Sequence, residues 1–154
     1  MAHSSNLLLA ASAVLLVTVP AVFPVAREAR AVEPARPMAL RGVMEKLGRD
    51  MQGVTGAISR EDWTTVAYLA QGIARHAEPP LAEKMRILAW AGTDSGTFRS
   101  FDGQTHEAAV AMGEAAKRGD GQAVIAAFAS VQKSCLACHQ GFRQQFVEHF
   151  YGQR

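Results

Sequence analysis

The sequence contains little cysteine and no cluster of like charge. Its 154 residues include only two cysteines, Cys135 and Cys138, which lie three positions apart. Small secreted domains that depend on long-range disulfides need cysteines spread along the chain, so this class is excluded. Basic and acidic residues are interspersed and the formal net charge is only +2, so no basic stripe for binding nucleic acid is present. The cysteine spacing instead indicates a cofactor or a redox role.

The sequence also lacks strand patterns and the common catalytic motifs. No segment alternates apolar and polar residues over the length of a strand, and no internal repeat occurs. No Ser-His-Asp set, Cys-His nucleophile pair, phosphate-binding loop or pair of catalytic carboxylates is identifiable. Apolar residues make up 49% of the chain and charged residues 19%, a globular mixture. We therefore expect a globular all-α protein that is not an enzyme.

The N-terminus has no Lys or Arg ahead of a long apolar run at residues 7–25. An Ala-Arg-Ala sequence follows at 29–31, a small-x-small pattern of the type that signal peptidase accepts. We predict that residues 1–31 are a signal peptide and that the protein is exported to the periplasm. The alternative is an uncleaved membrane anchor, which the length of the run permits but Pro20 and Pro24 disfavour.

Residues 32–37 include two prolines and predict a linker, followed by one domain over 38–154. In this domain apolar residues recur at spacings of three and four, which is typical of amphipathic helices. The predicted helices span residues 38 to about 56, 63 to about 76, about 102 to 118 and 121 to 142, with a short helical piece at 81–90. The glycine-rich stretch 92–96 predicts an irregular crossing loop. Four such helices with short connections favour an antiparallel four-helix bundle.

The sequence Cys135-Leu136-Ala137-Cys138-His139 is the attachment signature of c-type haem. Its two thiols form thioether bonds to the haem vinyl groups, and the histidine ligates the iron. Both cysteines and the histidine fall on one face of a helix, so they can address one flat macrocycle. A zinc site would need two more ligands, and redox Cys-x-x-Cys pairs usually lie beside a strand. We predict one covalently bound haem c.

With this motif in its last predicted helix, the chain resembles the class II c-type cytochromes, which include cytochrome c-prime and cytochrome c-556. The resemblance covers about residues 38–146 and is strongest over 126–143, where an aromatic residue and an arginine follow the motif. Class I cytochromes carry the motif near the N-terminus instead. The resemblance implies an antiparallel four-helix bundle with haem bound at the C-terminal helix. It also implies a homodimer formed through the first two helices.

By the same resemblance, Met44 in the first helix faces the distal side of the iron. In members like cytochrome c-556 a methionine there ligates the iron and makes a six-coordinate electron carrier, whereas c-prime members leave the iron five-coordinate and open to NO or CO. A thioether is a soft ligand that raises the reduction potential. The alternative is a purely structural role, in which Met44 fills the core as part of an apolar stripe. Peroxidase chemistry would need a distal acid–base group, and no histidine lies between Met38 and Gly56.

The main prediction is thus a periplasmic electron-transfer cytochrome with His139 and Met44 on the iron, which exchanges electrons with redox partner proteins. The alternative is a five-coordinate cytochrome that binds NO or CO.

Three more residues are predicted near the haem. Arg41 lies one turn before Met44 and could pair with a propionate, or be a solvated arginine. Phe142 would pack on the macrocycle or in the core, and Arg143, by resemblance, lies near the imidazole of His139. The other histidines outside the predicted signal peptide are expected at the surface, and the tryptophans in core or haem-edge packing: His76, His106, His149, Trp63 and Trp90.

Overall fold

The computed structural model describes residues 37–152, and all of its regular elements are helical. The elements in this range are α1 (Ala39–Ser59), α2 (Trp63–Ala74), α3 (Leu81–Ala91), the 3₁₀ turn η1 (Gly92–Asp94), α4 (Ser95–Lys117), α5 (Gly121–Cys138), the π-helical turn η2 (His139–Arg143) and α6 (Gln144–Tyr151). The predicted signal peptide, at 1–31, lies outside these residues, as does most of the predicted linker. None of the described helices is both long and apolar enough to span a membrane.

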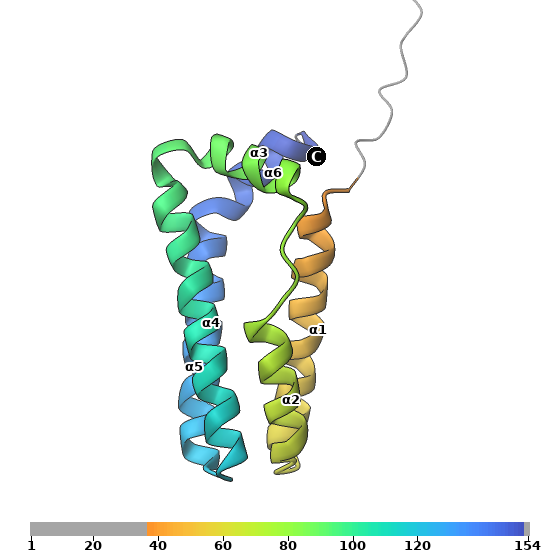
Figure 1. Cartoon of the computed structure of the whole chain (residues 1–154), viewed down its shortest axis with the longest axis vertical. Helices are drawn as coiled ribbons and strands as arrows, with labels where there is room; N and C mark the ends of the chain where they lie inside the picture. Colours follow the sequence, from red (N-terminus) through yellow and green to blue (C-terminus); the bar gives the residue numbers. More distant parts are fainter. Residues whose placement is uncertain (1–36, 153–154) are drawn as a thin grey trace, which may run out of the picture. The chain divides into compact units, whose positions relative to one another are not determined.

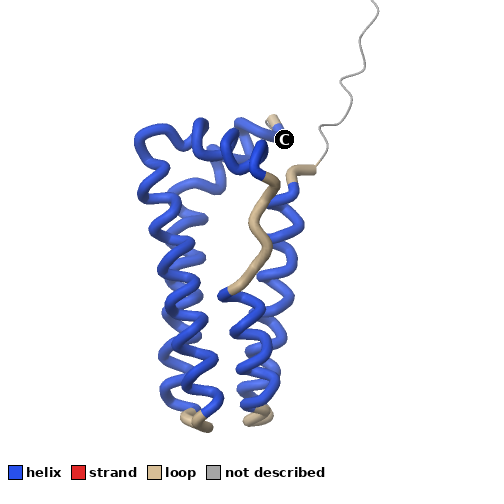
Figure 2. Tube along the Cα trace, viewed as in Figure 1, coloured by secondary structure: helices blue, strands red, loops and turns tan. Residues whose placement is uncertain are grey.

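The helices α1, α2, α4 and α5 run lengthwise in alternating directions and form the predicted antiparallel four-helix bundle (Figure 1). α1 packs on α2, α2 on α4, and α4 on α5. An extended segment leads from the end of α2 to α3, and α3 and α6 lie across the end at which α1 begins (Figure 2). The sequence-based fold class is confirmed.

Aspartate caps begin two of the bundle helices at its other end. The Asp62 side chain accepts a hydrogen bond from the Thr65 amide at 3.0 Å, and Asp120 accepts one from the Ala123 amide at 3.0 Å. Hydrogen bonds from the Thr65 side chain and then from its amide lower the pKa of Asp62. Between α4 and α5 the chain passes through Gly119 at a φ of +67°, a conformation that glycine adopts without strain. Both turns follow local sequence signals, an aspartate cap in each and a glycine in the second.

The core fills the middle and this capped end of the bundle. Its largest fully buried side chains are Ile73, Met112, Val54, Val66, Val124 and Val131. Small residues bring α2 and α4 together, since a Cβ added at Gly113 would lie 3.4 Å from the Cβ of Ala70. The small residues of α4 therefore serve close helix packing.

We expect Met112→Ala to destabilise the protein strongly, because Met112 has no exposed surface and its removal leaves a cavity. The expected loss is about 2–5 kcal/mol in the free energy of unfolding, measured by urea titration of the haem-loaded protein. Met85→Ala is the matched control, since Met85 is 58% exposed and should change stability by less than about 0.5 kcal/mol. Equal losses at the two positions would contradict this assignment of the core.

The prediction of an irregular loop at 92–96 is wrong. α3 ends at Ala91 with Gly92 as its C-cap, whose φ of +54° suits a glycine, and after the short turn η1 the next helix begins at Ser95 instead of near Asp102. Glycine lowers helix propensity but does not forbid a helix that tertiary contacts stabilise. Those contacts come from residues distant in the sequence, which is why the local pattern misplaced the start of α4.

Aromatic rings from α3, α4, η2 and α6 form a cluster at the end of the bundle where α1 begins. We call it the aromatic cap, made of Trp90, Phe98, Phe101, Phe142, Phe146 and Phe150. Phe98 and Phe142 meet edge to face with centroids 5.3 Å apart, and Trp90 lies 6.2 Å from Phe142. These contacts hold the first turns of α4 in place. Trp90 thus has the packing role predicted for it.

His76 was expected at the surface, and this is wrong. Its side chain is only 16% exposed, and its Nε2 lies 3.0 Å from Oδ1 of Asp102 in α4. The chain turns back onto α4 where α2 ends, which buries the ring. The hydrogen bond raises the pKa of His76 and lowers the pKa of Asp102. His106 and His149 are exposed, as predicted.

This pair should make stability depend on pH. The raised pKa means that His76 stabilises the fold fully below its ordinary pKa of about 6.5, and that this contribution fades as pH rises through the folded-state pKa. We expect His76→Gln to lower the free energy of unfolding at pH 6 by about 0.5–1 kcal/mol more than at pH 9, measured by urea titration. A constant effect of His76→Gln across this range would contradict the ion pair.

Candidate haem site

The haem-attachment motif lies where α5 passes into η2. Cys135 and Cys138 belong to the last turn of α5, and His139 is the first residue of η2. Both cysteines are half-buried and free of disulfide bonds, and Cys135 packs against the bundle core. The helical spacing places the two sulfurs and the imidazole on one face, as predicted. Two free thiols on one helix face are what thioether attachment of a haem requires.

Burial raises the pKa of both thiols. The pKa of Cys138 rises to about 11, with smaller contributions from Cys135 and from the carboxylate of Asp102. The pKa of Cys135 is also raised by burial, although a hydrogen bond with Thr105 acts the other way. Within residues 37–152 no group of three or more His, Cys, Asp and Glu side chains is placed to hold a metal ion. The zinc alternative therefore finds no donor set in the described residues.

His139 is favoured in its neutral form. Partial burial of the ring is the main cause that lowers the pKa of this imidazole, and the positive charge of Arg143 lowers it further. A neutral imidazole is the form that ligates a metal. Arg143 itself is exposed, and its predicted place near the imidazole stays a prediction.

The π-helical turn that begins at His139 was not predicted. It interrupts the regular pattern between α5 and α6 and carries Phe142 into the aromatic cap, where it meets Trp90 and Phe98. Single π turns inside helices occur frequently at functional sites. Phe142 is thus held by other aromatic rings, and its predicted contact with the macrocycle stays a prediction.

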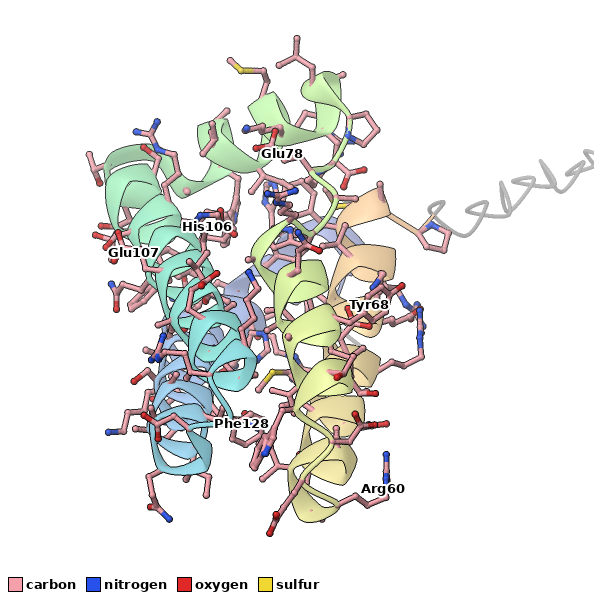
Figure 3. The ribbon with its side chains drawn as sticks, turned by 60° about the horizontal axis from the view of Figure 1, so that its bottom comes forward. Arg60, Tyr68, Glu78, His106, Glu107 and Phe128 are labelled. Carbon is pink, nitrogen blue, oxygen red and sulfur yellow. The ribbon has the colours of Figure 1, made fainter. Side chains whose placement is uncertain are left out.

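The level of Met44 relative to the motif follows from contacts between neighbouring helices. A Cβ added at Gly72 of α2 would lie 3.6 Å from a carboxylate oxygen of Asp50 in α1, which places Gly72 beside Asp50. Two residues later, the Ala74 carbonyl lies 2.7 Å from Nδ1 of His106 in α4. Figure 3 shows His106 on the side of α4 that faces α2. The end of α2 therefore lies level with the middle of α1 and with the middle of α4.

The register then carries over from α4 to α5. The hydroxyls of Thr105 and Ser134 share a buried hydrogen bond of 2.7 Å, so Ser134 lies at the level of His106. Ser134 directly precedes Cys135, and Met44 lies six residues before Asp50, toward the start of α1. Met44 and the attachment motif therefore occupy the same end of the bundle.

Met44 is 42% exposed, so it does not serve as core filler among the described residues. The next residues of its apolar stripe, Leu47 and Met51, are half-buried and pack on the edge of the core. Phe128 of α5 does the same on the inner side of that helix, toward α1 and α2 (Figure 3). In this part of the chain α1 and α5 make few close backbone contacts. A thioether and apolar side chains on α1 thus share the bundle end with two thiols and an imidazole on α5, a donor set that fits haem c.

Comparison with known proteins agrees with this site. A family model described as Cytochrome C' matches residues 39–143, well over half of the chain and including the attachment motif. The chain belongs to the cytochrome c-prime family. It is therefore a class II c-type cytochrome, and the family implies haem c as its cofactor. A search of curated proteins and a search of solved structures gave no match.

In this cytochrome the remaining site prediction concerns Arg41. Its guanidinium is exposed and lies 2.9 Å from the carboxylate of Glu45, one turn further along α1. An exposed pair of this kind contributes little to stability and leaves the guanidinium free to exchange partners. Contact between Arg41 and a haem propionate stays a prediction.

Three features near the motif were missed from the sequence. The hydroxyl pair of Thr105 and Ser134 supports the helix turn that precedes Cys135, and Glu83 binds the start of α1. α6 extends beyond the matched family region and brings Tyr151 to the start of α1. The sequence signal for the contact of Glu83 with α1 was an acidic residue in the first turn of α3, which does not indicate the residues that it binds.

Proposed function

We propose that this cytochrome is an exported electron carrier with haem c attached through Cys135 and Cys138 and with His139 and Met44 on the iron. The observation that supports it is the placement of Met44. The side chain lies at the bundle end of the motif and is not taken up by the protein core. When bound, the haem supplies a one-electron ferric–ferrous couple.

The residues of the chain have distinct roles in this proposal. The two thiols tether the group, and the neutral imidazole of His139 donates a nitrogen. The thioether of Met44 is a soft donor that favours the ferrous state and so raises the reduction potential. Apolar side chains such as Leu47 and Phe128 exclude water, which also shifts the potential.

We further propose export to the periplasm through residues 1–31, with an uncleaved anchor as the less favoured case. Redox partner proteins meet such carriers through small, weak interfaces, and a homodimer through α1 and α2 is the oligomer that the family suggests. Mass spectrometry of the exported protein tests the first point, because cleavage after Ala31 removes a defined mass.

The second candidate is a five-coordinate cytochrome that binds NO or CO. The same exposure of Met44 supports it, because a flexible thioether that packing does not fix can also stay off the iron. In that case Met44 and Leu47 would line a pocket for a small gas.

Optical spectra of the purified haem-loaded protein, ferric and ferrous, with and without CO, decide between the two. Low-spin bands, a methionine-to-iron charge-transfer band and indifference to CO are expected for the electron carrier. High-spin bands and rapid CO uptake would overturn it in favour of the gas-binding protein.

A further inference from the structure

The start of α1 is capped by another helix. The residue before it, Met38, provides no side-chain cap, and the first turn of α1 contains no acidic residue. Instead, Glu83 of α3 accepts hydrogen bonds from two successive amides, from Ala39 at 2.9 Å and from Leu40 at 2.8 Å. A helix start leaves such amides without partners and carries a partial positive charge. The Glu83 carboxylate accepts hydrogen bonds from two of these amides, and its negative charge offsets the partial positive charge of the helix start.

A second side chain completes this contact. The amide of Met38 donates a hydrogen bond to the hydroxyl of Tyr151 in α6 at 3.1 Å, and Met38 is 8% exposed. Three successive amides at the start of α1 are thus held by side chains from α3 and α6. We call Glu83 and Tyr151 the α1 clamp.

The clamp holds a part of α1 that α2 does not reach. α2 ends at Ala74, and two residues before this end Gly72 still lies beside Asp50, six residues after Met44. The first turns of α1, including Met44, therefore extend past the end of α2 toward α3 and α6 (Figure 1). Two hydrogen bonds to successive amides fix both the position and the rotation of these turns.

α3 connects the two helices that carry the predicted axial ligands. Toward its start Glu83 binds α1, and near its other end Trp90 lies 6.2 Å from Phe142 in the turn that begins with His139. Through these side chains α3 therefore contacts both the helix that carries Met44 and the turn that begins with His139.

We infer that Glu83 is a positioning residue for the sixth iron ligand: by capping α1 it places the thioether of Met44 at the iron. This inference rests on the proposed ligation by Met44. Met44 lies five residues after Ala39, about 7.5 Å along the helix, so a small shift or rotation of the first turn moves its sulfur directly. No substitution at Met44 itself is needed to weaken the bond.

The test compares Glu83→Ala and Glu83→Gln with the unchanged haem-loaded protein. Glu83→Ala removes both hydrogen bonds and the charge, and we expect the rate of CO binding to the ferrous protein to rise about tenfold, together with a larger high-spin ferric fraction. Glu83→Gln keeps one acceptor oxygen and should lie between the two. Glu78→Gln is the control, since Glu78 is exposed and binds only Lys84 among the described residues.

Hydrogen exchange gives a readout that does not depend on the iron. In Glu83→Ala the peptide covering the first turn of α1 should exchange faster, while the peptide around Val54 should not change. Unchanged exchange at the first turn would overturn the clamp. An effect of Glu78→Gln equal to that of Glu83→Gln would overturn it as well.

Met44→Ala separates failure of this inference from failure of the proposed ligation. If Met44→Ala leaves the spectra unchanged, Met44 is not a ligand and both ideas fail. If Met44→Ala gives high-spin iron while both Glu83 variants keep the original spectra and CO rate, only the positioning role fails. In the double variant, Glu83→Ala should add nothing to the spectral change of Met44→Ala; a further change of equal size would show that its effect bypasses Met44.

Discussion

Replacing both Cys135 and Cys138 by serine should give a chain that carries no haem after denaturation. A serine hydroxyl does not form the thioether bond, so only the iron–imidazole bond of His139 would remain, and unfolding breaks it. The haem content of the denatured chain should fall from one per chain to none. Haem absorbance that migrates with the denatured polypeptide, and the intact mass of the chain, measure this.

Ser134→Ala is the matched control for the cysteine variants. Ser134 adjoins the motif and shares a buried hydrogen bond with Thr105, so its loss should cost about 1 kcal/mol of stability but leave the haem attached. Each single cysteine variant should keep one thioether bond and show a shifted reduced pyridine spectrum. Haem that stays covalently bound in the double variant would contradict attachment at this motif.

The parts of this site that sequence could predict are local. The helical repeat alone places Cys135, Cys138 and His139 on one face. The amide that Asp62 caps lies only three residues further along the chain. The bundle itself follows from apolar periodicity and short connections. In each case the interacting groups lie within one or two turns of each other.

The features that sequence missed depend on distant partners. Glu83 and Ala39 are 44 residues apart, and the hydrogen bond between His76 and Asp102 spans 26 residues. Periodicity places a residue on a face of its own helix but does not say which other helix that face meets. The early start of α4 has the same origin, because Phe98 packs on a ring more than forty positions away.

The exposure of Met44 also had to come from the structure. On the sequence it belongs to the same apolar stripe as Leu47 and Val54, yet Val54 is fully buried and Met44 is 42% exposed. The stripe runs from the closely packed middle of the bundle to the end where α1 extends beyond the last residue of α2. One pattern therefore serves two purposes along its length, core packing in one half of α1 and the candidate haem site in the other.

Met44→Leu should convert the iron from six-coordinate and low-spin to five-coordinate and high-spin. Leucine has a similar volume and apolar character but no sulfur, so the change removes the donor with little change in shape. If the sulfur leaves the iron free for roughly 1% of the time in the original protein, full opening makes apparent CO affinity about a hundredfold higher. Ferric and ferrous spectra and a CO titration measure both effects, and the reduction potential should fall with the loss of the soft ligand.

Met85→Leu is the matched control, because it makes the same chemical change at an exposed position of α3. It should leave the spectra, the potential and the CO affinity unchanged. Since Met44 is partly exposed, its replacement should also leave the free energy of unfolding of the haem-free chain within about 0.5 kcal/mol of the original. A spectral change without a stability change therefore identifies a ligand and not a packing residue. Unchanged spectra in Met44→Leu, with rapid CO uptake already present in the original protein, would instead establish the five-coordinate gas-binding cytochrome.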